Sequence, residues 1–193
     1  MENNHDNTQQ PTGNGAQMNE LMHRLQKEDA RNLRIFKNFR GIFAVFIVFY
    51  TLFFIVNPMK ELKLPERVTG VCYVLAFVVF AWVFRKHYKE YSTIDYALPV
   101  TEMLEKAVKR YALQHRKSLI LIIPLLLIDC GITITFYRHL DVFSPLQRIG
   151  LVQVVYIPTL ILSYLIGVWI WYKRQKPIRD KALRLLEELK SFM

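Results

Sequence analysis

The sequence predicts an all-α membrane protein: a four-helix transmembrane bundle with cytosolic helical extensions and a C-terminal amphipathic helix. The chain has 193 residues, of which 52% are hydrophobic and 22% are charged. Its apolar residues lie in four dense blocks of about 16 to 24 residues, not in the helical or strand periods of a soluble domain. Basic residues flank these blocks, so membrane orientation explains the net charge of +10 better than nucleic-acid binding does.

Each apolar block is predicted to be a membrane-spanning helix. A helix needs about 20 apolar residues to cross a hydrocarbon layer of about 30 Å. In lipid, every backbone polar group must be bonded internally, and a helix achieves this within one segment. The predicted spans are residues 41–59, 68–84, 119–137 and 149–172.

The remaining segments are predicted to be polar tails, loops and surface helices. Residues 1–18 are rich in Asn and Gln and predict a disordered cytosolic tail. Residues 19–40 predict a cytosolic helix that leads into the first span. The segment 85–118 predicts a cytosolic loop with an amphipathic helix at 99–114, which is expected to continue into the third span. Residues 177–192 predict a second cytosolic amphipathic helix.

The basic residues also predict the orientation of the chain. Segments 1–40, 85–118 and 173–193 hold six, eight and seven Lys or Arg residues, so 21 of the 26 in the chain. The positive-inside rule therefore places both termini and the central loop in the cytosol. The two outer loops have about a dozen residues each, too few for a folded sensor domain, which excludes a receptor with an extracellular ligand-binding domain.

Two apolar stripes at helical spacing mark the predicted cytosolic helices. In the central loop, Pro99 suits a first helical turn, and Pro177 can open the helix of the tail. Each stripe needs a covering surface, for which three alternatives stand: the stripes cover one another, they lie on lipid headgroups, or they bind another protein. The predicted interaction face comprises Val100, Met103, Leu104, Ala107, Val108, Tyr111, Ile178, Ala182, Leu185, Leu189 and Phe192.

Asp129 is the one acidic residue inside a predicted span. Its insertion costs about 2.5–3.5 kcal/mol, so a compensating contact or a function is expected. The alternatives are hydrogen bonding between helices, a proton or substrate relay, and a water-exposed site. The polar residues at compatible depth are Tyr50, Thr51, Gln153 and Tyr156.

Small residues recur every four positions in the fourth span. Thr159, Ser163 and Gly167 form a small-xxx-small ribbon that lets another helix approach closely. The ribbon predicts either packing within the chain or the contact face of a homodimer.

The run Thr93-Ile94-Asp95-Tyr96-Ala97-Leu98-Pro99, with the helix that follows it, resembles small multi-span bacterial inner-membrane proteins of uncharacterised function. The likeness covers about a tenth of the chain and contains no catalytic residues. It implies an integral protein of a bacterial inner membrane.

These observations predict a noncatalytic membrane adaptor or regulator, which presents a cytosolic helical surface to a cytosolic or membrane protein. Two alternatives stand beside it: a small proton-coupled transporter or channel that uses Asp129, and a membrane-shaping or assembly protein. The sequence contains no acid–base or nucleophile constellation, no phosphate loop and no metal-ligand spacing. We therefore expect no enzymatic activity, cofactor, metal or nucleic acid. The expected partners are the lipid bilayer with its anionic headgroups, a protein, and further copies of the chain.

Overall fold

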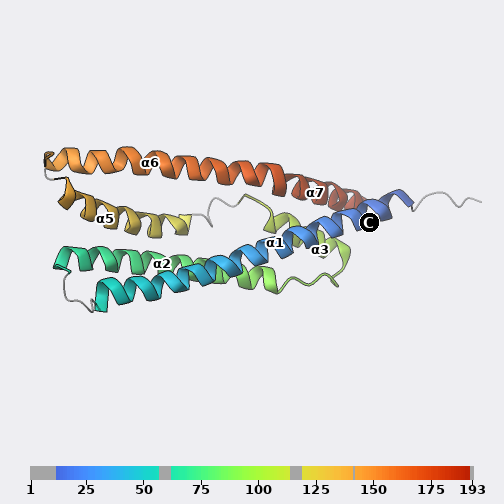
Figure 1. Ribbon diagram of the computed structural model, residues 1–193. Coiled ribbons are helices and arrows are strands. Elements are labelled where there is room, and N and C mark those ends of the chain that lie inside the picture. The colour runs from blue at the N-terminus through green and yellow to red at the C-terminus, as the bar shows by residue number, and fades with distance from the viewer. Residues whose placement is uncertain (1–11, 57–61, 114–118, 141, 192–193) are drawn as a thin grey trace, which may run out of the picture.

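The computed structural model describes residues 12–56, 62–113, 119–140 and 142–191, and the regular elements of this part of the chain are all helices (Figure 1). The prediction of an all-α protein is confirmed in this part of the chain. The helices in chain order are α1 Thr12–Tyr50, the π-helix η1 Thr51–Val56, α2 Leu64–Ser92, α3 Val100–Arg110, the 3₁₀ turn η2 Leu119–Leu121, α5 Ile122–His139, α6 Pro145–Ile170, the π-helix η3 Trp171–Gln175 and α7 Lys176–Ser191.

Four helical segments are long and apolar enough to cross a membrane. They are Gly15–Val56, Leu64–Ser92, Leu119–His139 and Pro145–Ser191, and each contains one of the four apolar blocks. These four helices indicate a membrane protein.

The four long helices form an open row in which each packs mainly on its sequence neighbour. Among α1, α2, α5 and α6, the main contacts join α1 to α2, α2 to α5 and α5 to α6, and Figure 1 shows α6 on the outside of the row. The sequence predicts a four-helix bundle; in the structure α6 buries only Val152. Because α6 is apolar around its whole circumference, it has no single face that must turn toward a core.

Both helical hairpins begin their second helix with a local capping interaction. The backbone N–H of Lys63 donates to Glu66 Oε2 at 2.7 Å, and that of Ser144 donates to Gln147 Oε1 at 3.1 Å. A proline follows in the first turn in each case, where its missing N–H costs nothing. At the α5–α6 turn, Arg148 also donates to the carbonyl oxygens of Phe143 and Tyr137.

Helix ends differ from the predicted ones in three places. α1 begins at Thr12, so residues 12–18 of the predicted disordered tail are helical, whereas residues 1–11 lie outside the described part of the chain. α3 ends at Arg110 and does not continue into the third apolar helix, because Tyr111 closes its last turn. α7 is not opened by Pro177: it continues from α6 through η3.

Aromatic rings join α1 to α2 along most of their shared length. Ring centroids lie 5.2 Å apart for Phe39 and Phe84, 5.1 Å for Phe43 and Phe80, and 5.2 Å for Tyr50 and Phe77. Aromatic pairs at such separations stabilise packing beyond the area that they bury. Phe36 lies against Tyr91 in the last turns of α2, so the part of α1 that precedes Phe36 extends beyond the end of α2.

Candidate functional site

At one end of the molecule, three helices form a small packed unit, which we call the cap. It consists of residues 18–32 of α1, the loop 93–99 with α3, and α7 (Figure 1). The buried residues of its apolar core are Leu21, Leu25, Met103, Leu104, Ala107, Tyr111, Ala182, Leu185 and Leu186. Each helix brings one apolar stripe to this core, so the three stripes cover one another.

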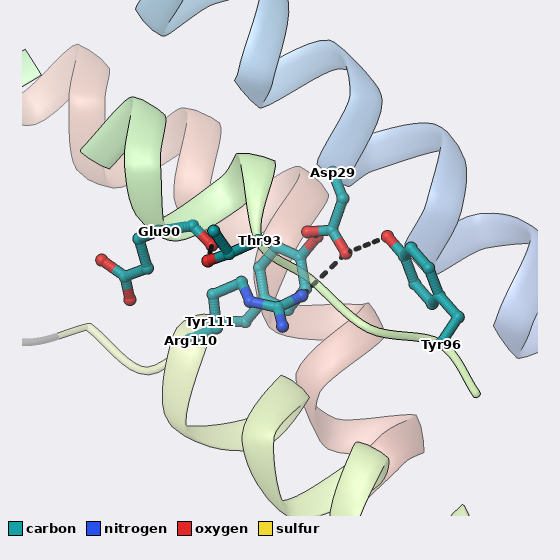
Figure 2. A network of polar contacts seen from close by, with 6 residues as sticks. All are labelled: Asp29, Glu90, Thr93, Tyr96, Arg110 and Tyr111. Atoms are coloured by element: carbon teal, nitrogen blue, oxygen red, sulfur yellow. Dashed lines mark hydrogen bonds and ion pairs between the residues drawn. The ribbon is translucent and has the colours of Figure 1, made fainter. Parts of the chain in front are cut away.

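A buried carboxylate lies beside this core. Asp29 is 3% exposed and receives three hydrogen bonds from other parts of the chain (Figure 2). Tyr111 Oη donates to Oδ1 at 2.6 Å, while Tyr96 Oη and Arg110 Nη1 donate to Oδ2 at 2.8 Å and 2.7 Å. A buried carboxylate requires such compensation because removal of its hydration is costly.

The Asp29 contacts join segments that are far apart in the sequence. Tyr96 belongs to the loop before α3, whereas Arg110 and Tyr111 close the carboxyl end of α3. Trp171 Nε1 of η3 donates to the carbonyl oxygen of Tyr111 at 3.0 Å. The cluster therefore fixes α3 against α1 and ties the α6–α7 junction to the same point.

Ion pairs close the edges of the cap. Lys181 of α7 lies 2.9 Å from Glu20 of α1, and Lys190 of α7 lies 2.7 Å from Glu105 of α3. The lysine holds the pKa of Glu105 below its ordinary value through its hydrogen bond and its charge. Such exposed pairs contribute little stability individually, so the apolar core and Asp29 carry most of the cap's stability.

Two tyrosines of the Asp29 cluster have pKa values above their ordinary one. Burial is the largest cause for both Tyr96 and Tyr111, and donation of the phenol proton to Asp29 raises the pKa of each further. The positive charge of Arg110 opposes these effects. The folded cap therefore keeps both phenols protonated at pH values where an unfolded chain would release their protons.

This pKa difference predicts a loss of cap stability at high pH. Below the ordinary tyrosine pKa of about 10, the folded and the unfolded states both keep the phenol proton, so these tyrosines do not make the free energy of unfolding depend on pH. Above about pH 10, the unfolded state loses the proton first, and the free energy of unfolding falls by about 1.4 kcal/mol per pH unit for each tyrosine. Thermal unfolding in mild detergent between pH 8 and 11 measures this fall. Tyr111→Phe should be less stable at every pH but should have a shallower pH slope, and an unchanged slope would contradict the assignment.

The predicted interaction face lies mostly inside the cap. Among its residues, Met103, Leu104, Ala107, Tyr111, Ala182 and Leu185 are buried, and Val108, Ile178 and Leu189 pack against the core. Val100 is exposed, and Phe192 lies outside the described residues. The buried stripe residues are therefore not an outward docking face, because the stripes of α1, α3 and α7 cover one another.

Asp129 is positioned by α5 and makes a hydrogen bond to α6. Gln153 Nε2 donates to Asp129 Oδ1 at 2.7 Å, while Tyr156 Oη donates to the carbonyl oxygen of Leu125 at 2.6 Å. The other two residues at compatible depth lie elsewhere: Tyr50 contacts the rings of Tyr73 and Phe77, and Thr51 begins η1. This geometry matches the interhelical hydrogen-bonding alternative.

The small-residue ribbon of α6 does not pack against another helix along most of its length. Thr159, Ser163 and Gly167 are all exposed, and a Cβ added at Gly167 would meet no atom within 4 Å. The hydroxyl groups of Thr159 and Ser163 donate to carbonyl oxygens of α6 itself. Packing within the chain was one expectation, but among the described residues α5 begins only at Ile122, after the turn η2, and does not extend along the second half of α6.

Sequence reasoning missed Asp29, Arg110 and Tyr96. A signal for the first was present, since Leu21, Leu25 and Asp29 are spaced four apart and lie on one helical face. Arg110 and Tyr96 gave no signal, because neither lies near Asp29 in sequence.

Comparison of the chain with protein-family models, with curated proteins and with solved structures gives no match. The cap and the long apolar helices are therefore the features of this chain that bear on its function.

Proposed function

We propose that this protein is a noncatalytic integral-membrane adaptor that holds a preassembled helical cap at the membrane surface for a protein partner. One observation carries the proposal: three amphipathic helices bury their apolar stripes in one another around a hydrogen-bonded Asp29. This arrangement gives the cap a fixed shape independently of any partner. A preformed surface binds with less loss of conformational entropy than one that must fold on contact.

The outer face of α7 is the proposed contact surface. It carries the exposed charges of Arg184, Glu187 and Glu188 on the side opposite the buried Ala182, Leu185 and Leu186. A partner would therefore recognise a charged helical face, and charge complementarity would set its specificity. In this proposal the cap faces the cytosol, in line with the concentration of basic residues around it.

Affinity purification of the full-length protein in mild detergent tests this proposal. The test variant is Arg184→Glu with Glu187→Lys, which reverses the charge pattern of α7 without changing the net charge. We expect the intact protein to recover a near-stoichiometric partner and the variant to recover at least about tenfold less, because close interfacial charge pairs are worth a few kcal/mol. Deletion of α7 is the weaker test, since it would expose the cap core as well.

A charge exchange on α3 serves as the matched control. Glu102→Lys with Lys106→Glu swaps an exposed ion pair whose atoms lie 2.8 Å apart and leaves the α7 face intact. This control should recover the partner as the intact protein does. Recovery of the same proteins with all three forms, or of the protein alone with each, would contradict the proposal.

A further inference from the structure

Six exposed basic side chains border the apolar segments where these meet the cap. They come in pairs from three helices and are called the basic collar: Lys37, Arg40, Arg85, Lys86, Lys173 and Arg174. Each pair lies next to the end of an apolar block: α1 enters its block after Arg40, α2 leaves its block before Arg85, and the fourth block ends within η3, before Lys173. The collar therefore occupies the level at which a membrane-spanning helix meets the headgroups.

Contacts within the protein place the three pairs at the same end of the molecule. The guanidinium of Arg40 lies 4.9 Å from the ring centroid of Tyr88, which joins α1 to α2. Arg110 lies 5.8 Å from the ring of Tyr91 near the end of α2, and the neighbouring Tyr111 accepts the hydrogen bond from Trp171 of η3. In Figure 1 the α6–α7 junction and the last turns of α2 both lie toward the end of the long helices where α3 and α7 are found.

The collar differs from the cap in its charge balance. The sequence contains no Asp or Glu at positions 30–60, 67–89 or 142–179, the stretches that supply the collar. In the cap, by contrast, Lys106, Lys181 and Lys190 are each paired with a glutamate. The nearest carboxylate on α2 is that of Glu90, which already lies 3.6 Å from His87. The positive charge of the collar is therefore not cancelled along its own helices.

Aromatic rings support several collar cations. Lys173 lies 4.4 Å from the ring centroid of Trp169, and Lys86 lies 5.8 Å from that of Trp82. Tryptophan rings favour the depth of the headgroups, and a cation over the ring is held at that depth. Pairs of this kind present their charge to the headgroup layer instead of extending it into bulk water.

We propose that the basic collar binds the phosphate groups of anionic phospholipids and so fixes the cap against the membrane surface. Lys and Arg near an anionic membrane surface are each attracted to it, and salt weakens the attraction. The collar fits this ligand because its charge is unbalanced, exposed and at headgroup level, whereas Lys106, Lys181 and Lys190 of the cap are each paired with a glutamate.

The full-length protein in nanodiscs provides the test. Thermal unfolding is measured in discs of phosphatidylcholine that contain increasing amounts of phosphatidylglycerol. The series gives the mole fraction of phosphatidylglycerol needed for half-maximal stabilisation. The test variant changes Arg40, Lys86, Lys173 and Arg174 to Gln. We expect this mole fraction to rise at least about fivefold in the variant, which is the effect of about one fully engaged charge, and we expect 0.5 M NaCl to weaken the stabilisation of the intact protein.

A second variant with the same change in net charge separates the effect of the collar from the effect of the overall charge of the protein. It changes Lys27, Lys106, Arg184 and Lys190 of the cap to Gln, and its half-maximal fraction should shift less than about twofold. A third form that exchanges Lys and Arg at the four collar positions should behave as the intact protein does.

Three outcomes would overturn the proposal: equal stabilisation of the intact protein by the two lipids, equal shifts in the collar and cap variants, or insensitivity to salt. The salt titration uses the intact protein, so insensitivity to salt would overturn the proposal even where the collar variant fails to insert. The partner assay described above uses α7 charges that are absent from the collar, so the two proposals fail independently.

Discussion

Asp29→Asn is expected to lower the stability of the cap by about 3 kcal/mol, since removal of one member of a buried ion pair typically costs 3–5 kcal/mol. The side chains of Asp29 and Arg110 are only 4% and 13% exposed. Without the carboxylate charge, the guanidinium would remain buried and would lose the ion-pair partner that lies 2.7 Å away. Tyr96 and Tyr111 would also lose their charge-assisted hydrogen bonds.

Amide hydrogen exchange of α3 in the full-length protein measures this loss. A destabilisation of about 3 kcal/mol corresponds to an increase of about a hundredfold in the opening equilibrium of the cap. Glu28→Gln is the matched control, because it removes one negative charge from the adjacent position of α1. Glu28 pairs with Arg31 on the same helix at 3.2 Å, and loss of such a local pair should cost less than about 1 kcal/mol.

The double variant Asp29→Asn with Arg110→Met separates the ion pair from the other contacts. Removal of both charges eliminates the unpaired guanidinium, so exchange should slow again relative to Asp29→Asn alone. Exchange of α3 in Asp29→Asn as slow as in Glu28→Gln would show that the cluster does not support the cap.

The cap illustrates which parts of the site the sequence could predict. The stripes of Met103, Leu104 and Ala107 on α3 and of Ala182 and Leu185 on α7 follow the helical period, and a period identifies the face that must be covered. The period does not identify which surface of the protein, lipid or partner covers that face. Burial of one stripe by another depends on chain connections that bring α1, α3 and α7 to one end of the molecule.

The Asp29 cluster lay beyond prediction for a different reason. An acidic residue among alternating charges, such as those of residues 27–34, normally marks a solvated helical face. Its burial depends on Arg110 and Tyr111, more than 80 residues later in the chain. For Asp129, the depth in the predicted span indicated Gln153 as one of four possible partners, and the structure shows that hydrogen bond. Depth alone does not indicate how each helix is rotated about its own axis, so it could not select among the four.

The four apolar helices were predictable from the apolar blocks, because block length alone decides whether a segment can cross a bilayer. The open row was not, since contact between apolar helices in lipid depends on small residues and close fit instead of on hydrophobicity. The glycines of α2 and α5 show where that fit is closest.

Gly70→Ala is expected to lower the stability of the α1–α2 hairpin by about 2–3 kcal/mol, a typical cost of forcing extra atoms into a packed interface. Gly70 is buried in α2, and a Cβ added there would overlap the Cβ and ring of Phe54 in η1. The Cβ of Phe54 is attached directly to the backbone, so it cannot move aside by rotation of a side chain. Relief would therefore require the two helices to separate.

Gly131 of α5 should respond less strongly than Gly70. A Cβ added there would lie 2.7 Å from Cε1 of Tyr73, but the ring can shift because its Cε atom is far from the backbone. Gly131→Ala is accordingly expected to cost about 1 kcal/mol, the lower end of the range for overpacking.

Gly150→Ala and Gly167→Ala are the matched controls in α6. No atom lies within 4 Å of a Cβ built at either position, so neither change meets steric resistance, and alanine is the better helix former by about 1 kcal/mol in water. Thermal unfolding of the four variants in one detergent should therefore order their stabilities as Gly70→Ala lowest, then Gly131→Ala, then the two α6 variants at or above the intact protein. If Gly70→Ala were as stable as Gly150→Ala, the close approach of α2 to η1 would be wrong, because a methyl group at position 70 fits only when these helices lie farther apart.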